Sequence, residues 1–152
     1  MTNVPSTYLV DSNILLYAYD ASEGAKRTRA IELLQRLTEN GSGALSIQVL
    51  SEFYVNAIRK IRPPMLPETA AETVAHYLFV WRVLDLTSSL LSEAVRCATR
   101  YQLSYWDALI WAAAKLNDIP IILSEDIQSS GAIEGVQIMN PLLPTFDMTA
   151  LR

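Results

Sequence analysis

The sequence predicts an α/β fold with a parallel central sheet that is covered by helices on both faces. Short apolar segments alternate with longer segments of helical periodicity, an order that requires crossover connections between parallel strands. One helical segment, residues 105–116, is apolar on nearly every face, which indicates a buried helix. The chain has 152 residues, of which 51% are hydrophobic. We therefore expect a single domain with a large core.

The first half of the chain contains two predicted strands and several helical segments. Residues 8–10 form an apolar run that ends at Asp11, and residues 43–46 allow a very short strand. An apolar stripe at spacings of three and four residues predicts the second helical segment, which Gly41 closes. Pro63 and Pro64 separate the helical segment 47–60 from the segment 67–79, and Pro67 suits the first turn of the latter. The predicted helical segments are residues 14–18, 26–38, 47–60 and 67–79.

The second half continues the alternation. Helices are predicted over residues 88–101 and 105–116. Predicted strands are residues 83–86, 120–123 and 136–139, the last of them stopped by Asn140-Pro141.

Composition excludes several kinds of site. The chain has one cysteine, Cys97, and one histidine, His76, so it has no internal disulfide, no zinc or iron–sulfur site built on several cysteines, and no metal site that needs two histidines. Its net charge of −4 argues against nucleic-acid binding through bulk positive charge, although a local basic strip remains possible. Any metal chemistry must therefore use oxygen ligands.

No export signal or membrane span is expected. The first residues are polar, and the apolar runs are far shorter than the roughly 18 residues that a span requires. Together with the single unpaired thiol, this predicts a cytoplasmic protein.

Four acidic residues are placed so that they can meet. Asp11 follows the first strand directly, and Asp126 comes three residues after the strand that ends at Leu123. The carboxyl ends of parallel strands share one edge of a sheet. Two helices can bring Asp107 and Glu52 to the same edge. Converging carboxylates repel one another unless a cation neutralises them, and Mg²⁺ or Mn²⁺, as one ion or as a pair about 3.5–4 Å apart, suits such oxygen ligands.

Each acid also has a purely structural interpretation. Asp107 lies in a capping-box sequence with Ser104, and Asp11 and Asp126 could cap short turns. Glu52 shares a helix stripe with Asn56 and Arg59 that could be a solvated face. Capping and a pocket role are compatible, so the hypothesis depends on the joint placement of the four acids.

These residues lie in stretches that resemble the PIN-domain ribonucleases, especially the toxins of VapBC-type toxin–antitoxin pairs. The resemblance runs in order over about residues 8–139. The matching stretches are Tyr8-Leu9-Val10-Asp11-Ser12-Asn13-Ile14-Leu15-Leu16-Tyr17-Ala18, Ser46-Ile47-Gln48-Val49-Leu50-Ser51-Glu52-Phe53-Tyr54, Ser104-Tyr105-Trp106-Asp107-Ala108-Leu109-Ile110 and Leu123-Ser124-Glu125-Asp126.

The resemblance implies a three-layer α/β/α sandwich and a Mg²⁺- or Mn²⁺-dependent endoribonuclease. By matching position, Asp11, Asp107 and Asp126 would hold the metal, and Glu52 would complete the site or help to deprotonate the attacking water. Glu125 could replace Asp126 in this set. Ser124 and Asn13 match supporting positions beside the last and first acids. In-line attack by hydroxide would leave a 5′-phosphate and a 3′-hydroxyl.

An acidic ribonuclease still needs contacts to RNA. Lys26, Arg27 and Arg29 form one basic cluster. We favour the second cluster, Arg59, Lys60 and Arg62, as a rim that holds phosphates, because it follows the helix of Glu52. A solvated face favoured by the helix dipole would explain the same residues.

Other functions fit the sequence less well. A receiver domain would need a late lysine after a strand, and an aspartyl phosphatase would need an aspartate where Asn13 stands. A non-catalytic protein- or RNA-binding partner would tolerate loss of pocket acids, and all four are present. The resemblance further implies an antitoxin partner and a homodimer, for which the sequence offers only the apolar, aromatic stretch 77–81.

Overall fold

The computed structural model describes residues 7–127 and 131–151, and within them the predicted alternation of strands and helices is confirmed. The strands are β1 (Tyr8–Val10), β2 (Gly43–Ser46), β3 (Arg82–Leu84), β4 (Ile121–Leu123), β5 (Ala132–Ile133) and β6 (Val136–Met139). The α-helices are α1 (Ser12–Tyr19), α2 (Ala25–Asn40), α3 (Ile47–Arg59), α4 (Pro67–Val80), α5 (Ser88–Tyr101) and α6 (Tyr105–Leu116). Two short 3₁₀ helices, Ala21–Glu23 and Met148–Ala150, complete the elements.

The sheet has the strand order β3-β2-β1-β4-β6-β5. Its first five strands are parallel, and β5 pairs antiparallel with β6. The predicted parallel central sheet is confirmed, and β5 adds one antiparallel strand at its edge. A two-residue turn, Glu134-Gly135, makes this hairpin, and both residues have positive φ (47° and 86°), as a type I′ turn requires.

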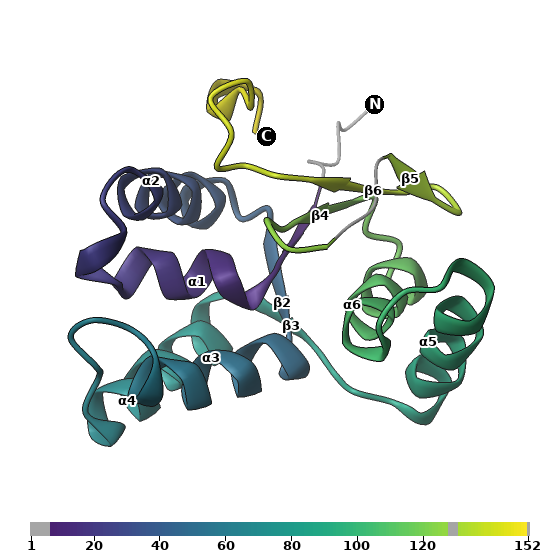
Figure 1. The fold of residues 1–152 in the computed structure, drawn as a ribbon, viewed down its shortest axis with the longest axis horizontal. Coiled ribbons are helices and arrows are strands. Elements are labelled where there is room, and N and C mark those ends of the chain that lie inside the picture. Colours follow the sequence, from purple (N-terminus) through teal and green to yellow (C-terminus); the bar gives the residue numbers. More distant parts are fainter. Residues whose placement is uncertain (1–6, 128–130, 152) are drawn as a thin grey trace.

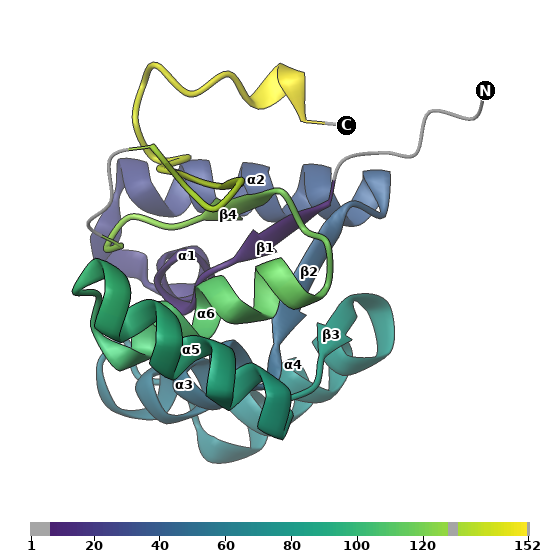
Figure 2. The same ribbon diagram turned by 90° about the vertical axis from the view of Figure 1, so that its right-hand side faces the viewer.

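Helices cover both faces of the sheet, as predicted. Figure 1 shows α1, α2, α3 and α4 on one face and α5 and α6 on the other, and the view in Figure 2 places α5 and α6 in front of the strands. The buried side chains form one core between these layers, and it includes Trp111, Phe53 and Leu9. The predicted buried helix is confirmed, because every residue of α6 from Ala108 to Ala114 is buried. No helix among the described residues is both long enough and apolar enough to span a membrane.

Local capping residues set the helix ends, and two of them, Ser104 and Gly41, are predicted from the sequence. Ser46 caps α3 by accepting a hydrogen bond from the Val49 amide (3.1 Å), and Ser104 caps α6 through the Asp107 amide (3.1 Å). Gly41 ends α2 with a left-handed φ of 63°. The lone thiol of Cys97 is buried in the core, and burial raises its pKa.

One close approach within the sheet is testable. A β-carbon on Gly43 of β2 would overlap the ring of Trp81, which is fixed by a hydrogen bond to Thr38 Oγ1 (3.0 Å) and by an edge contact with Tyr77. We predict that Gly43→Ala lowers the free energy of unfolding by about 1–3 kcal/mol through overpacking. Urea denaturation measures it. In a Trp81→Leu background the same substitution should cost far less, and an equal cost in both backgrounds contradicts the explanation.

Candidate active site

The pairing of β1 with β4 brings two site residues together. Val10 lies opposite Leu123, and the Asp11 amide donates to the Leu123 carbonyl (3.0 Å). Asp11 is thus beside Ser124, whose hydroxyl donates to Asp11 Oδ2 (2.7 Å). Asp11 Oδ1 accepts from the Ser12 amide (2.7 Å) at the start of α1, so this acid is also a helix cap. Asp11 is therefore a helix cap, and this role is compatible with a place in the candidate site.

The carboxyl group of Asp11 carries the clearest electrostatic perturbation. Burial raises its pKa from 3.8 to about 6, hydrogen bonds from Ser124 and Ser12 oppose this rise, and the charges of Glu52 and Asp107 add to it. Asp107 shows the same pattern: burial raises its pKa, Ser104 opposes the rise, and the charges of Asp126 and Glu52 reinforce it. The four predicted acids therefore share one electrostatic environment.

Glu52 is fixed on both of its oxygens. Its Oε2 accepts from the Ser12 hydroxyl (2.7 Å), and its Oε1 accepts from Gln48 Nε2 (2.9 Å), one turn earlier on α3. Gln48 Nε2 also donates to the Trp106 carbonyl (3.1 Å) in the first turn of α6. Gln48 thereby links the helix of Glu52 to the helix of Asp107.

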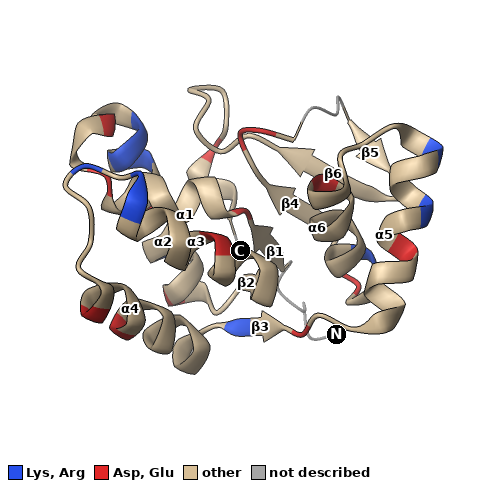
Figure 3. Ribbon diagram, turned by 60° about the horizontal axis from the view of Figure 1, so that its bottom comes forward, with Lys and Arg blue, Asp and Glu red and all other residues tan. Residues whose placement is uncertain are grey.

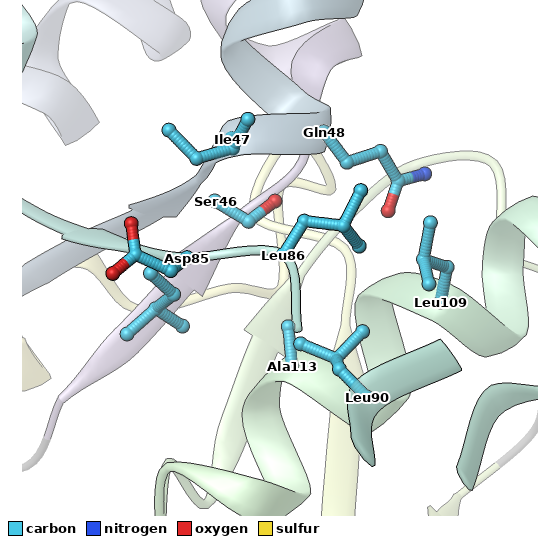
Figure 4. A pocket seen from close by; sticks show the side chains of 9 residues that line it. Ser46, Ile47, Gln48, Asp85, Leu86, Leu90, Leu109 and Ala113 are labelled. Carbon is cyan, nitrogen blue, oxygen red and sulfur yellow. The ribbon is translucent and has the colours of Figure 1, made fainter. Parts of the chain in front are cut away.

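A small cavity lies beside Gln48. Figure 4 shows its lining, in which Gln48 faces Leu86 and Leu109, with Ser46 nearby. Its volume is about 10 Å³, close to the space of a single water molecule. The Gln48 Oε1 atom is buried and has no hydrogen-bond partner among the described residues.

The turn after β4 holds the last acid. Ser124 is buried, and its hydroxyl accepts from the amides of Asp126 (3.2 Å) and Ile127 (3.4 Å). Asn13 Nδ2 donates to Asp126 Oδ2 (3.0 Å), so Asn13 contacts the last acid and the Ser124 hydroxyl contacts the first. This side-chain pairing is the reverse of the expected one, in which Ser124 supports Asp126 and Asn13 orients Asp11. Glu125 makes its contacts elsewhere, with Tyr17 and Lys26.

The oxygen donors of the four acids suit a hard cation, although the carboxylates are too far apart to surround one ion in the present arrangement. The four acids supply oxygen ligands, and no ion pair in residues 7–127 and 131–151 involves any of them. Asn13 Oδ1 is buried and has no partner within the same residues. Across the described part of the chain, no three His, Cys, Asp or Glu side chains are close enough to surround one ion. The acids share one region and would have to draw together around a metal.

The two basic clusters differ. Arg29 of the first donates to the carbonyls of Pro141 (2.9 Å), Leu143 (3.0 Å) and Phe146 (3.2 Å), which fixes the C-terminal segment, and Lys26 pairs with Glu125. Arg59, Lys60 and Arg62 are exposed at the end of α3 and after it. Figure 3 shows acidic segments between α3 and α6, and basic segments near the ends of α2 and α3 that lie farthest from α6.

Sequence reasoning missed four residues around the acids. Ser12, Gln48, Tyr17 and Lys26 all donate hydrogen bonds to carboxylates of this region. Gln48 could have been found by its i, i+4 spacing from Glu52. The partners of Ser12 and Tyr17 are 40 and 108 residues away in the chain, and no local pattern indicates them.

The chain belongs to the PIN domain family, whose model matches residues 8–130. A search of curated protein sequences gave no significant match. Among solved structures, the chain is similar to the Mycobacterium tuberculosis toxin VapC20, described as a Sarcin-Ricin loop cleaving toxin, with 22% identity, a TM-score of 0.62, and coverage of 79% of this chain and 90% of that one. The resemblance to the PIN family and to VapC toxins is thereby confirmed.

Two further structures show the same fold. A toxin–antitoxin complex from Klebsiella pneumoniae has 20% identity and a TM-score of 0.64, covering 89% of this chain and 98% of that one. VapBC2 from Rickettsia felis, bound to a DNA fragment from its promoter, has 18% identity and a TM-score of 0.63, covering 88% and 98%. At these identities the similarity establishes the fold.

The raised pKa of Asp11 predicts how stability depends on pH in metal-free protein. The native state holds the Asp11 proton up to about pH 6 and the unfolded state only to about 3.8, so this group destabilises the fold as pH rises through that window. Asp11→Asn should match wild type below pH 4 and exceed it above pH 6 by up to about 3 kcal/mol. Urea denaturation across this range measures the difference. Asp118→Asn, in an exposed loop, is the control, and a flat difference for Asp11→Asn contradicts the prediction.

Proposed function

We propose that this PIN domain is a Mg²⁺- or Mn²⁺-dependent endoribonuclease and the toxin of a type II toxin–antitoxin pair acting in the cytoplasm. One observation carries the proposal. Asp11, Glu52, Asp107 and Asp126 come from four different elements into one electrostatic environment without an ion-pair partner in the described residues. Carboxylates that cluster without a positive partner repel one another, and a functional cation is a common reason to keep them together.

Asp11, Asp107 and Asp126 are the residues that would hold the metal, with Glu52 beside them. When bound, a divalent ion lowers the pKa of a water and stabilises negative charge on a phosphate. The protein's own contribution is orientation. Ser124 directs Asp11, Asn13 directs Asp126, and Ser12 with Gln48 fixes Glu52. Hydrogen bonds on both Glu52 oxygens favour a role in charge balance and orientation over proton transfer.

RNA would approach along α3. An apolar groove of about 400 Å³ adjoins Glu52, and its lining includes Val55, Leu86 and the exposed Trp106. The basic rim begins at Arg59, the last residue of the same helix, which lies seven residues beyond Glu52 and about 10 Å along the helix axis. Acids, groove and rim therefore form one surface, with Arg59, Lys60 and Arg62 contacting phosphates.

Protein partners belong to the same proposal. The predicted apolar stretch divides in the structure: Tyr77 and Trp81 are buried, whereas Leu78, Phe79 and Val80 are exposed, Phe79 by 91%. Exposed apolar side chains in such a group are typical of protein contacts. They support binding of an antitoxin and of a second copy of this chain, and the Klebsiella structure is itself a toxin–antitoxin complex.

Asp11→Asn tests the activity. Purified wild type should cleave labelled structured RNA with Mn²⁺ and stop when EDTA is added, and Asp11→Asn should be slower by at least about 100-fold because a metal ligand is removed. Asp118→Asn, with an exposed acid far from the site, should match wild type. Tight partner binding without metal-dependent cleavage would instead favour the non-catalytic interpretation.

The basic rim makes a separate prediction. Replacing Arg59, Lys60 and Arg62 together by alanine should raise KM for RNA with little change in kcat, because these residues bind phosphates away from the reacting bond. The slope of log affinity against log salt should fall by about 0.7 for each phosphate that the variant no longer binds. Arg36→Ala with Arg100→Ala removes charge from α2 and α5 and serves as the control. An unchanged salt slope in the triple variant contradicts this role.

A further inference from the structure

The carboxylate of Glu125 is held outside the acidic pocket. Tyr17 Oη donates to Glu125 Oε1 (2.5 Å), and Lys26 Nζ lies 3.1 Å from both Glu125 oxygens. Lys26 Nζ also lies 5.0 Å from the centre of the Tyr17 ring, within range of a cation–π contact. Three side chains from α1, α2 and the turn after β4 thus form one closed cluster.

Helix α1 supplies a separate hydrogen-bond donor to each of the adjacent acids Glu125 and Asp126. Asn13 and Tyr17 are four residues apart on α1, so they lie on one face. Asn13 donates to Asp126 and Tyr17 donates to Glu125. Glu125 and Asp126 are adjacent in the loop after β4, and their donors Tyr17 and Asn13 are one helical turn apart on α1. The two acids therefore cannot exchange places without breaking both hydrogen bonds.

The turn that carries these acids also supports Asp11. Ser124 Oγ donates to Asp11 Oδ2 and accepts from the Asp126 and Ile127 amides. A shift of the turn at Glu125 would therefore disturb both Asp126 and the hydroxyl that orients Asp11. The position of Glu125 consequently affects two of the proposed metal-holding residues.

We propose that Tyr17 and Lys26 are positioning residues that clamp Glu125 away from the acidic pocket, so that Asp126 is its fourth carboxylate. This inference rests on the proposed function. The clamp determines which of Glu125 and Asp126 joins the other three acids, a choice that the sequence alone leaves open. Lys26 also neutralises Glu125, which spares the pocket the repulsion of a fifth nearby carboxylate.

Manganese binding tests the clamp directly. The dissociation constant for Mn²⁺, measured by electron paramagnetic resonance on metal-free protein, should rise about 10-fold in the double variant Tyr17→Phe/Lys26→Met, the scale expected for residues that orient metal ligands. Tyr54→Phe/Arg27→Met makes the same chemical changes on α3 and α2 outside the cluster and should bind Mn²⁺ as wild type does. Thermal unfolding of each variant shows whether it is folded at the binding temperature.

Single variants identify the acid. Asp126→Asn should weaken Mn²⁺ binding more than Glu125→Gln does. A larger loss in Glu125→Gln, or wild-type affinity in the folded Tyr17→Phe/Lys26→Met protein, overturns the clamp while leaving the proposed function intact. Absence of Mn²⁺ binding by wild type overturns both.

Discussion

The parallel pairing of β1 with β4 is the constraint on which the candidate site depends. These adjacent strands end in register, so Asp11 and Ser124 leave the sheet side by side and the Ser124 hydroxyl reaches the Asp11 carboxylate. A change of register by one residue would turn alternate side chains to the other face and separate this pair. α3 and α6 then add Glu52 and Asp107 from opposite faces of the sheet, and Gln48 connects the two helices across the pocket.

Two acids outside the candidate site are neutralised by neighbouring side chains. On the α5–α6 side, Glu134 is held by Arg96, Lys115 and Tyr101, and these contacts lower its pKa to about 2. Near the pocket, Lys26 pairs with Glu125 and leaves Asp126 without a basic partner among the described residues. Glu134 and Glu125 are therefore neutralised by basic side chains, whereas the four candidate site acids have no ion-pair partner among the described residues. Their lack of a basic partner is compatible with a site for a divalent cation.

Much of the fold follows from local patterns that survive in the tertiary structure. The residue ranges of α5, α6, β2 and β6 match the sequence prediction, because apolar periodicity, the helix cap Ser104 and the strand stop at Asn140-Pro141 act locally. The hairpin of β5 was missed because its strand has two residues and its turn is Glu-Gly, which lacks the Asn-Gly or Asp-Gly signal of a type I′ turn. The four acids were predictable because each is tied to the end of a strand or to one helix.

The partners of the acids were less predictable. Ser12, Tyr17 and Lys26 contact carboxylates that are distant in sequence, and only tertiary packing selects those pairs. Arg29 illustrates the reverse: the sequence places it in a basic cluster, but it binds backbone carbonyls of the C-terminal segment. For both reasons the electrostatics of the site become visible only in three dimensions.

The central claim is that the clustered acids form a cation site. Its most direct test is the thermal stability of wild type and Asp11→Asn with and without Mn²⁺. Binding to the native state alone stabilises a protein by RT ln(1 + [L]/Kd), about 2.7 kcal/mol when the ion is at 100 times its Kd. We predict that Mn²⁺ raises the Tm of wild type and leaves that of Asp11→Asn nearly unchanged. An equal rise in both proteins would contradict the claim.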